Sequence, residues 1–298
     1  QQFLAEHTGA TLLVDSHTGA LLALASAPTF APDAVADNWN SLREDPASPL
    51  FNRATQAPVQ PGGALQTVIV AAAMEQNLPE AQLTQSLSAP VVWNSYSLTC
   101  RSTPGEPSWE SALAAACPAP FAAAGKVLST EQLAELFKRW ELTTAPTLEL
   151  PVIVADWNMQ NANPVMEALG QGELLVTPLQ MAGVVATVAN NGARPPLHLL
   201  ETSQPGCPSV PTYTMPVISS ADATRLRNSW TRWGEVAGHL STALAGPERT
   251  LTWFLGINST ELPRFAVVVL LENAAAPDEA AVIGRQLLDI SVAPSNGN

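Results

Sequence analysis

The sequence predicts an α/β (α+β) fold, in which a central, mostly antiparallel sheet is covered by helices and carries a helical lobe. Strand-like segments lie near both ends of the 298-residue chain, in residues 9–27 and 236–271, and helical patterns fill the stretch between them. A chain of this length can bury the core of one large domain. We therefore expect a single domain, with a sheet-containing part in residues 9–77 and 176–292 and a helical lobe in about 78–175.

The N-terminal segment predicts a β-hairpin, because the apolar runs Gly9–Asp15 and Ala20–Ser26 flank a short turn that ends in Gly19. A loop rich in Pro, Asp and Asn follows through Pro49. A proline and two glycines at residues 61–63 then open an apolar helix, as is typical of a helix N-terminus.

The later helices and strands follow from capping signals and apolar periodicity. Residues 129–140 open with Ser, Thr and Glu, which resembles a capping box. Residues 177–192 carry a proline in the first turn and a glycine past the end. The expected helices are residues 108–117, 129–140, 177–192, 221–233 and 278–290, and the expected C-terminal strands are residues 236–242, 250–256 and 264–271.

Composition excludes several classes of function. The formal net charge is −13 and there is no basic run, so the chain lacks the electrostatic footprint of a nucleic-acid-binding protein. No apolar stretch approaches the roughly 18–20 residues that span a bilayer. Because the chain starts at Gln1 rather than Met, we expect that a preceding piece, with any membrane anchor, has been removed.

The sequence predicts neither a metal nor a cofactor. The four histidines, His7, His17, His198 and His239, are far apart and fit no zinc-binding spacing. Glycine-rich phosphate loops and the Gly-x-Ser-x-Gly nucleophile motif are also missing from the sequence.

The three cysteines leave two alternatives open. Cys100, Cys117 and Cys207 make no Cys-x-x-Cys pair, and their odd number forbids complete internal pairing. In an oxidising compartment Cys100 and Cys117 can form one disulfide; otherwise all three are small apolar side chains.

Five segments, in order along the chain, resemble the transpeptidase domain of penicillin-binding proteins. Leu13–Ser26 resembles its opening strands, and Asp45–Gln56 resembles the segment before its catalytic serine. Gly170–Ala182, with Gly-Gln-Gly and Thr-Pro-Leu-Gln, is similar to a characteristic helix, and Trp253–Gly256 and Phe265–Val269 resemble paired C-terminal strands. The resemblance implies a penicillin-binding-protein/serine β-lactamase-like fold. It also implies a role in peptidoglycan assembly outside the cytoplasmic membrane, with the full-length protein membrane-anchored.

That family uses three motifs, Ser-x-x-Lys, Ser-x-Asn and Lys-Thr-Gly. The first places a lysine one helical turn from the nucleophilic serine, at a helix N-terminus whose N–H groups help to hold an oxyanion. The second offers a hydroxyl for proton transfer and an amide for the substrate. The third adds positive charge on an edge strand and leaves room for the substrate backbone.

All three motifs are lost in this chain. We call the positions that match these motifs the degenerate cleft. Gly63 and Gln66 stand at the first motif, and Ala116 and Pro118 stand at the second. His239, Leu240 and Ser241 stand at the third, and Thr242 matches the threonine that follows it. The only two lysines, Lys126 and Lys138, both lie in the expected lobe, and neither follows a serine by three residues. Losing the serine of such a unit alone costs about 10⁶ in turnover, so the sequence predicts no catalytic residue.

The leading hypothesis is therefore a catalytically inactive pseudo-transpeptidase that serves as a binding or scaffolding module in cell-envelope assembly. Its expected partners are other cell-wall, division or elongation proteins, with weak binding of peptidoglycan peptide at best. One alternative is a repurposed hydrolase, with His239 as base and Ser241, Thr242 or Thr67 supplying a hydroxyl; His239 and Ser241 share a strand face. Another alternative is that side chains above Gly63 close the cleft. The domain would then be a structural spacer for partner proteins.

The eight tryptophans have two interpretations. They can be platforms for sugars or partner proteins, but core or half-buried packing is the commoner role, and we favour it. Trp230 and Trp233, at helical spacing, predict one cluster at an exposed edge.

Overall fold

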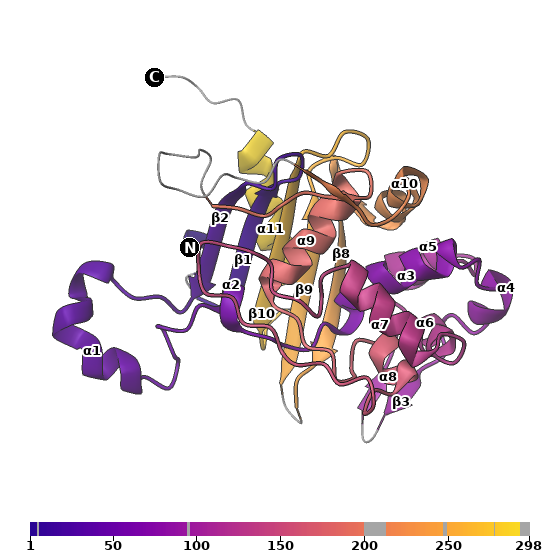
Figure 1. The fold of residues 1–298 in the computed structure, drawn as a ribbon, viewed down its shortest axis with the longest axis horizontal. Helices are drawn as coiled ribbons and strands as arrows, with labels where there is room; N and C mark the ends of the chain where they lie inside the picture. Colours follow the sequence, from indigo (N-terminus) through magenta and orange to yellow (C-terminus); the bar gives the residue numbers. More distant parts are fainter. Residues whose placement is uncertain (5, 94–95, 200–212, 247–248, 277, 293–298) are drawn as a thin grey trace.

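The structure is a computed structural model that describes residues 1–4, 6–93, 96–199, 213–246, 249–276 and 278–292. Its centre is a six-stranded antiparallel sheet with the strand order β2-β1-β10-β9-β8-β7 (Figure 1). The strands are β1 (Thr8–Asp15), β2 (Leu21–Ala27), β7 (Thr231–Trp233), β8 (Val236–Leu244), β9 (Thr250–Ile257) and β10 (Phe265–Glu272). The predicted fold class is confirmed.

The two ends of the chain meet in the middle of this sheet. β1 pairs with β10 from Thr8 opposite Glu272 to Asp15 opposite Phe265. The apolar residues of β10 are buried on both faces, which is why the strand reads as a continuous apolar run. The turn between β1 and β2 needs Gly19, whose φ is +84° and whose Cβ would lie 2.0 Å from a backbone oxygen.

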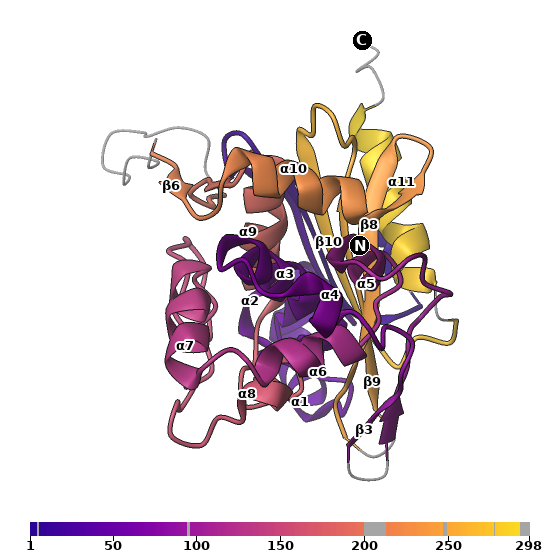
Figure 2. The same ribbon diagram turned by 90° about the vertical axis from the view of Figure 1, so that its right-hand side faces the viewer.

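Helices cover both faces of the sheet (Figures 1 and 2). α9 (Pro178–Ala189) packs on β1, β9 and β10, and every one of its residues is buried. Its start is a capping box that was not predicted from the sequence, in which Thr177 Oγ1 accepts from the Gln180 N–H and Gln180 Oε1 accepts from the Thr177 N–H. α11 (Glu279–Val292) covers the opposite face over β8, β9 and β10.

The region expected as a helical lobe also contains a small hairpin. Its helices are α4 (Glu80–Leu83), α5 (Trp109–Ala114), α6 (Ala119–Gly125), α7 (Thr130–Arg139) and α8 (Pro164–Ala168), and they follow α3 (Gln66–Glu75). The unexpected hairpin pairs β3 (Val91–Trp93) with β4 (Tyr96–Leu98). β-Branched and aromatic residues favour strands, which accounts for it.

One expected helix is wrong at its C-terminal end. The sequence predicts a helix over residues 221–233, but α10 (Ser220–Ser229) ends earlier and β7 begins at Thr231. β7 pairs with the start of β8 across a turn at Gly234, whose φ is +65°, so strand pairing overrides helical periodicity.

The expected exposed tryptophan cluster is wrong for the same reason. Trp230 is 2% exposed in the core cluster that contains α9, whereas Trp233 packs edge-on against Phe254 on the side of the sheet that α11 covers. Four of the eight tryptophans are buried, as the packing interpretation expects: Trp109, Trp140, Trp230 and Trp253.

The remaining elements are short, with one exception. α1 (Val35–Glu44) projects from the body of the molecule (Figure 1), and none of its residues is buried. Within the described residues, no helix combines the length and the apolar character that crossing a membrane requires. The short elements are η1 (Gln2–Leu4), η2 (Pro32–Ala34), α2 (Arg53–Gln56), η3 (Gly62–Leu65), β5 (Ala193–Arg194) and β6 (Met215–Pro216).

Candidate functional site

The degenerate cleft lies where the tight turn η3 meets β8. Gly62 has a φ of +50°, and a Cβ there would lie 2.4 Å from Ala243 Cβ. Its N–H donates to the Gly170 carbonyl at 2.8 Å. Contact with β8 on one side and with the Gly170 loop on the other therefore requires glycine at position 62.

The space beside Gly63 is occupied by Ser241. A Cβ at position 63 would lie 2.7 Å from Ser241 Cβ and 3.3 Å from Ser241 Oγ, and Ser241 is 1% exposed. A serine at position 63 would therefore require the backbone or Ser241 to move. This is the arrangement that the closed-cleft alternative expects.

His239 is buried behind the same turn and accepts no proton near neutral pH. Burial lowers its pKa to about 4; the carbonyls of Gly63 and Leu113 partly oppose this, and the nearby Arg101 charge adds to it. Its Nε2 lies 2.8 Å from the Gly63 carbonyl oxygen, which can only accept, so Nε2 carries hydrogen and donates. The basic lone pair of the neutral ring is then on Nδ1, and the low pKa of His239 makes it a weak base near neutral pH.

No base is hydrogen-bonded to the hydroxyls near the turn within the described residues. Gln66 Oε1, Thr67 Oγ1 and Ser241 Oγ are buried without a hydrogen-bond partner in the described part of the chain. No hydrogen bond between His239 and Ser241 occurs there either. A base activates a serine from about 2.6–3.2 Å, so sharing a strand face does not make this pair a nucleophile and base.

The other cleft positions are less closely gathered. Ala116 follows the end of α5 with a φ of +48°, and Pro118 is the residue before α6. Thr242 is exposed on β8, and Leu240 packs on the face that α11 covers. The structure thus brings Gly63, Gln66, His239 and Ser241 together and leaves Leu240 on the opposite side of the strand.

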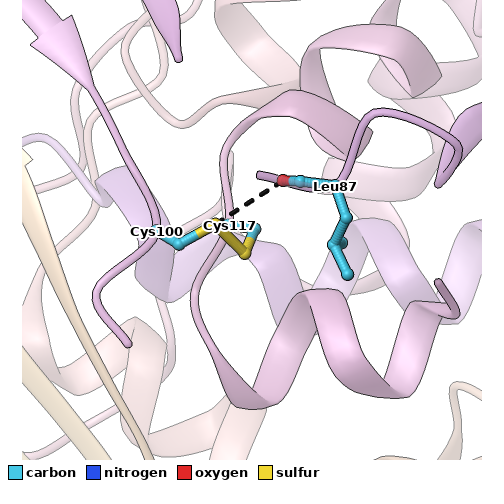
Figure 3. Close-up of a disulfide and its surroundings, with 3 residues drawn as sticks. All are labelled: Leu87, Cys100 and Cys117. Carbon is cyan, nitrogen blue, oxygen red and sulfur yellow. Dashed lines mark hydrogen bonds between the residues drawn. A yellow bond between two sulfur atoms is a disulfide. The ribbon is translucent and has the colours of Figure 1, made fainter. Parts of the chain in front are cut away.

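Cys100 and Cys117 are joined by a disulfide (Figure 3). The bond ties the segment after β4 to the residue that follows Ala116, and Cys117 is fully buried. The Leu87 carbonyl oxygen lies 3.5 Å from Cys100 Sγ. Cys207, the third cysteine, lies outside the described residues.

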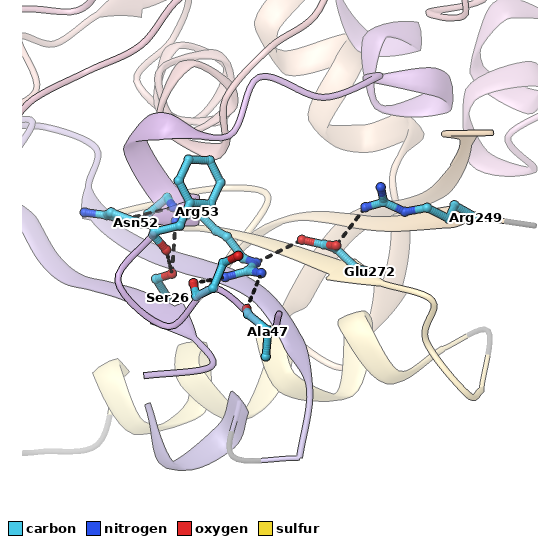
Figure 4. A network of polar contacts seen from close by, with 9 residues as sticks. Ser26, Ala47, Asn52, Arg53, Arg249 and Glu272 are labelled. Atoms are coloured by element: carbon cyan, nitrogen blue, oxygen red, sulfur yellow. Dashed lines mark hydrogen bonds and ion pairs between the residues drawn. The ribbon is translucent and has the colours of Figure 1, made fainter. Parts of the chain in front are cut away.

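The segment before η3 is held by Arg53, which no sequence pattern singled out (Figure 4). Arg53 is 7% exposed, and its Nε donates to Glu272 Oε1 at 2.9 Å. Its two terminal nitrogens donate to the carbonyls of Ala47 and Ser48. Arg249 binds the other oxygen of Glu272 at 2.9 Å. Arg53 is the first residue of the four-residue helix α2, which is too short to leave a pattern in the sequence, so only the fold reveals this network.

Comparison with known proteins places these features in a family. A family model described as the penicillin binding protein transpeptidase domain matches residues 9–246, which include every position of the degenerate cleft. The peptidoglycan D,D-transpeptidase PbpA of Mycolicibacterium smegmatis is 28% identical over an alignment of 327 residues, which covers 93% of this chain and 65% of that relative. The chain therefore spans less than two thirds of that protein's length.

Solved structures show the same fold. The imipenem acyl-enzyme complex of penicillin-binding protein A from Mycobacterium tuberculosis matches with a TM-score of 0.82 at 25% identity, covering 98% of this chain and 75% of that one. The complex of PBP2 with MreC from Helicobacter pylori matches with a TM-score of 0.74 at 18% identity, covering 97% and 61% of the two chains.

Proposed function

The chain belongs to the penicillin binding protein transpeptidase family, and we propose that it is a catalytically inactive member, acting as a binding or scaffolding module in peptidoglycan assembly. One observation carries the proposal: the side chain of Ser241 fills the space beside Gly63, where the family has its nucleophile. A substrate carbonyl then meets no hydroxyl at position 63, and a side chain there would collide with Ser241.

The polar side chains around position 63 have contacts that support a structural role inside the fold rather than a role in catalysis. His239 is neutral and donates to the Gly63 carbonyl, which fixes η3 against β8. Gln66 at the lysine position carries no charge that could lower the pKa of a hydroxyl. Binding of peptidoglycan peptide at the cleft is therefore weak at best.

Labelling with a fluorescent penicillin tests this proposal. We expect no covalent adduct with this chain under conditions that label penicillin-binding protein A of M. tuberculosis, the positive control, which forms an acyl-enzyme with penicillin G. A matched variant, Gly63→Ser with Gln66→Lys and Ser241→Gly, restores the first motif and removes the obstructing side chain. A stoichiometric adduct on any serine of the unmodified cleft would overturn the proposal.

The alternative of a repurposed hydrolase has one observation in its favour, the shared face of His239 and Ser241 beside Gly63. The lowered pKa of His239, about 4, and the missing hydrogen bond between His239 and Ser241 argue against it. We expect no turnover of ester substrates. Turnover that disappears in His239→Ala and persists in the exposed control His17→Ala would favour the hydrolase.

The proposed location is extracytoplasmic, with membrane anchoring in the full-length protein through a segment outside this chain. The disulfide supports an oxidising compartment, and the PBP2–MreC complex of a relative supports cell-wall or cell-shape proteins as partners. Non-reducing peptide mapping of the protein from its own cell envelope is expected to recover Cys100 linked to Cys117. Free thiols at both positions would contradict the proposed location.

A further inference from the structure

A second candidate site lies on the other side of β8 from the degenerate cleft. A cavity of about 250 Å³ opens between the segment around α5, the β7–β8 edge and α11, which meet in Figure 2. Its lining includes Arg101, Trp233, Leu240, Asp278, Val282 and Arg285. Leu240 is the only cleft position among its lining residues, and its side chain points away from His239 and Ser241.

Within the part of the chain that the structure describes, the arginines without a polar side-chain partner lie together in this pocket. The chain has 11 arginines, and within the described residues nine of them form an ion pair or a hydrogen bond through their side chains. The remaining two, Arg101 and Arg285, both line this cavity. In a chain of net charge −13, two unpaired guanidinium groups in one cavity indicate an anion-binding site.

The pocket's charges favour a singly charged anion. Two arginines and the single lining carboxylate, Asp278, leave one unit of positive charge. Burial lowers the pKa of Arg101, and the charge of Asp278 partly opposes this. Arg101 is still exposed overall and Arg285 is half-buried, so both guanidinium groups are accessible to a monoanion that enters from solvent. A doubly charged phosphate would exceed the available charge and be repelled by Asp278.

The rest of the lining is suited to an apolar group beside that anion. Trp233, Leu240 and Val282 form an apolar wall. The guanidinium of Arg285 lies over the Trp233 ring, 5.7 Å from its centroid, which orients its planar set of donors. The cavity is smaller than the roughly 300–1,000 Å³ of typical small-molecule sites, so it holds one residue rather than a long ligand.

We propose that this pocket binds a carboxylate attached to a small apolar group, as at the C-terminal residue of a peptide. A guanidinium pairs with both oxygens of a carboxylate, and capture of a terminal carboxylate is a recurring mode of peptide recognition. The inference goes beyond the proposed function, because it holds whether or not the degenerate cleft can react.

Calorimetry and ligand-observed NMR with the whole chain test it. N-acetyl-L-leucine is expected to bind, and its uncharged amide to bind at least tenfold more weakly. Arg285→Gln and Arg101→Gln should each lower the affinity at least tenfold, and Asp278→Asn should raise it. The matched control is Arg232→Gln, an exposed β7 arginine bonded to Asn228, which should leave the affinity unchanged.

Further measurements keep the result interpretable. Arg285→Lys retains the charge without the planar set of donors and should give an intermediate affinity, and thermal unfolding verifies that each variant is folded. Tighter binding of N-acetyl-L-leucine than of its D isomer points to a protein C-terminus, and the reverse to a wall peptide. Equal binding of acid and amide, tighter binding of inorganic phosphate, or unchanged affinity in folded Arg285→Gln would overturn the proposal.

Discussion

His239 is a buried residue that contributes a hydrogen bond rather than a charge. The lysine that the family resemblance implies at this position would bring charge into the cleft, whereas the imidazole is neutral, 2% exposed and bonded to the Gly63 carbonyl. Its pKa of about 4 lies below the ordinary value of 6.5. Between these values the unfolded chain binds more protons than the folded one, so stability falls as the pH falls through this window.

We predict that His239→Gln reduces this pH dependence. For the unmodified protein, His239 alone should cost about 2 kcal/mol of unfolding free energy between pH 7 and pH 5. Urea unfolding at both pH values measures the difference. His17→Gln, at an exposed position, should retain the full dependence, and an equal dependence in His239→Gln would refute the assignment.

At the scale of elements, the junction of η3 with β8 decides whether the cleft is open. Gly62 contacts Ala243 on β8, and Gly63 contacts Ser241 two residues before it. The turn η3 therefore packs directly against β8. Opening the site requires smaller residues on β8 as well as new chemistry on α3.

We predict that Gly63→Ser destabilises the fold by about 1–3 kcal/mol, because it overpacks the contact with Ser241. Ser241→Gly in the same chain should recover at least about 1 kcal/mol of this loss. Denaturant unfolding of the two single variants and the double variant measures the coupling. Strictly additive effects would mean that Ser241 does not occupy the space beside position 63.

At the scale of the whole molecule, the sheet joins distant parts of the sequence. β1 and β2 come from the start of the chain and pair with β10 from its end, so the sheet cannot form without both. We propose that residues 1–298 unfold as one domain that includes the lobe of about residues 78–175. Arg53 and Glu272 also lie far apart in the sequence, and their ion pair joins the segment before η3 to the end of β10.

We predict that Arg53→Ala lowers the free energy of unfolding by about 3 kcal/mol, because it leaves Glu272 and two backbone carbonyls without their buried partner. Arg43→Ala removes an exposed pair with Glu44 and should cost less than about 1 kcal/mol. Thermal and denaturant unfolding compare the two. Equal losses would mean that the network in Figure 4 contributes no more than a surface pair.

Much of the fold was predictable because its signals are local. The β1–β2 hairpin has its glycine turn, α7 has its capping box, α9 has a proline in its first turn, and β10 is a continuous apolar run. The strand β7 was missed because its pairing with β8 outweighs the helical periodicity of residues 221–233. The β3–β4 hairpin was missed because three-residue strands carry little periodicity.

By itself, the sequence determined that no Ser-x-x-Lys motif occurs in the chain, because such a motif is a matter of residue identity and spacing. It also determined the sheet and helix pattern, because periodicity and capping act over a few neighbouring residues. Only the tertiary structure decided that Ser241 fills the space beside Gly63 and that Arg101 and Arg285 line one cavity. These contacts join residues far apart in the chain, such as Gly63 and His239 at a separation of 176, and packing at that distance leaves no local pattern.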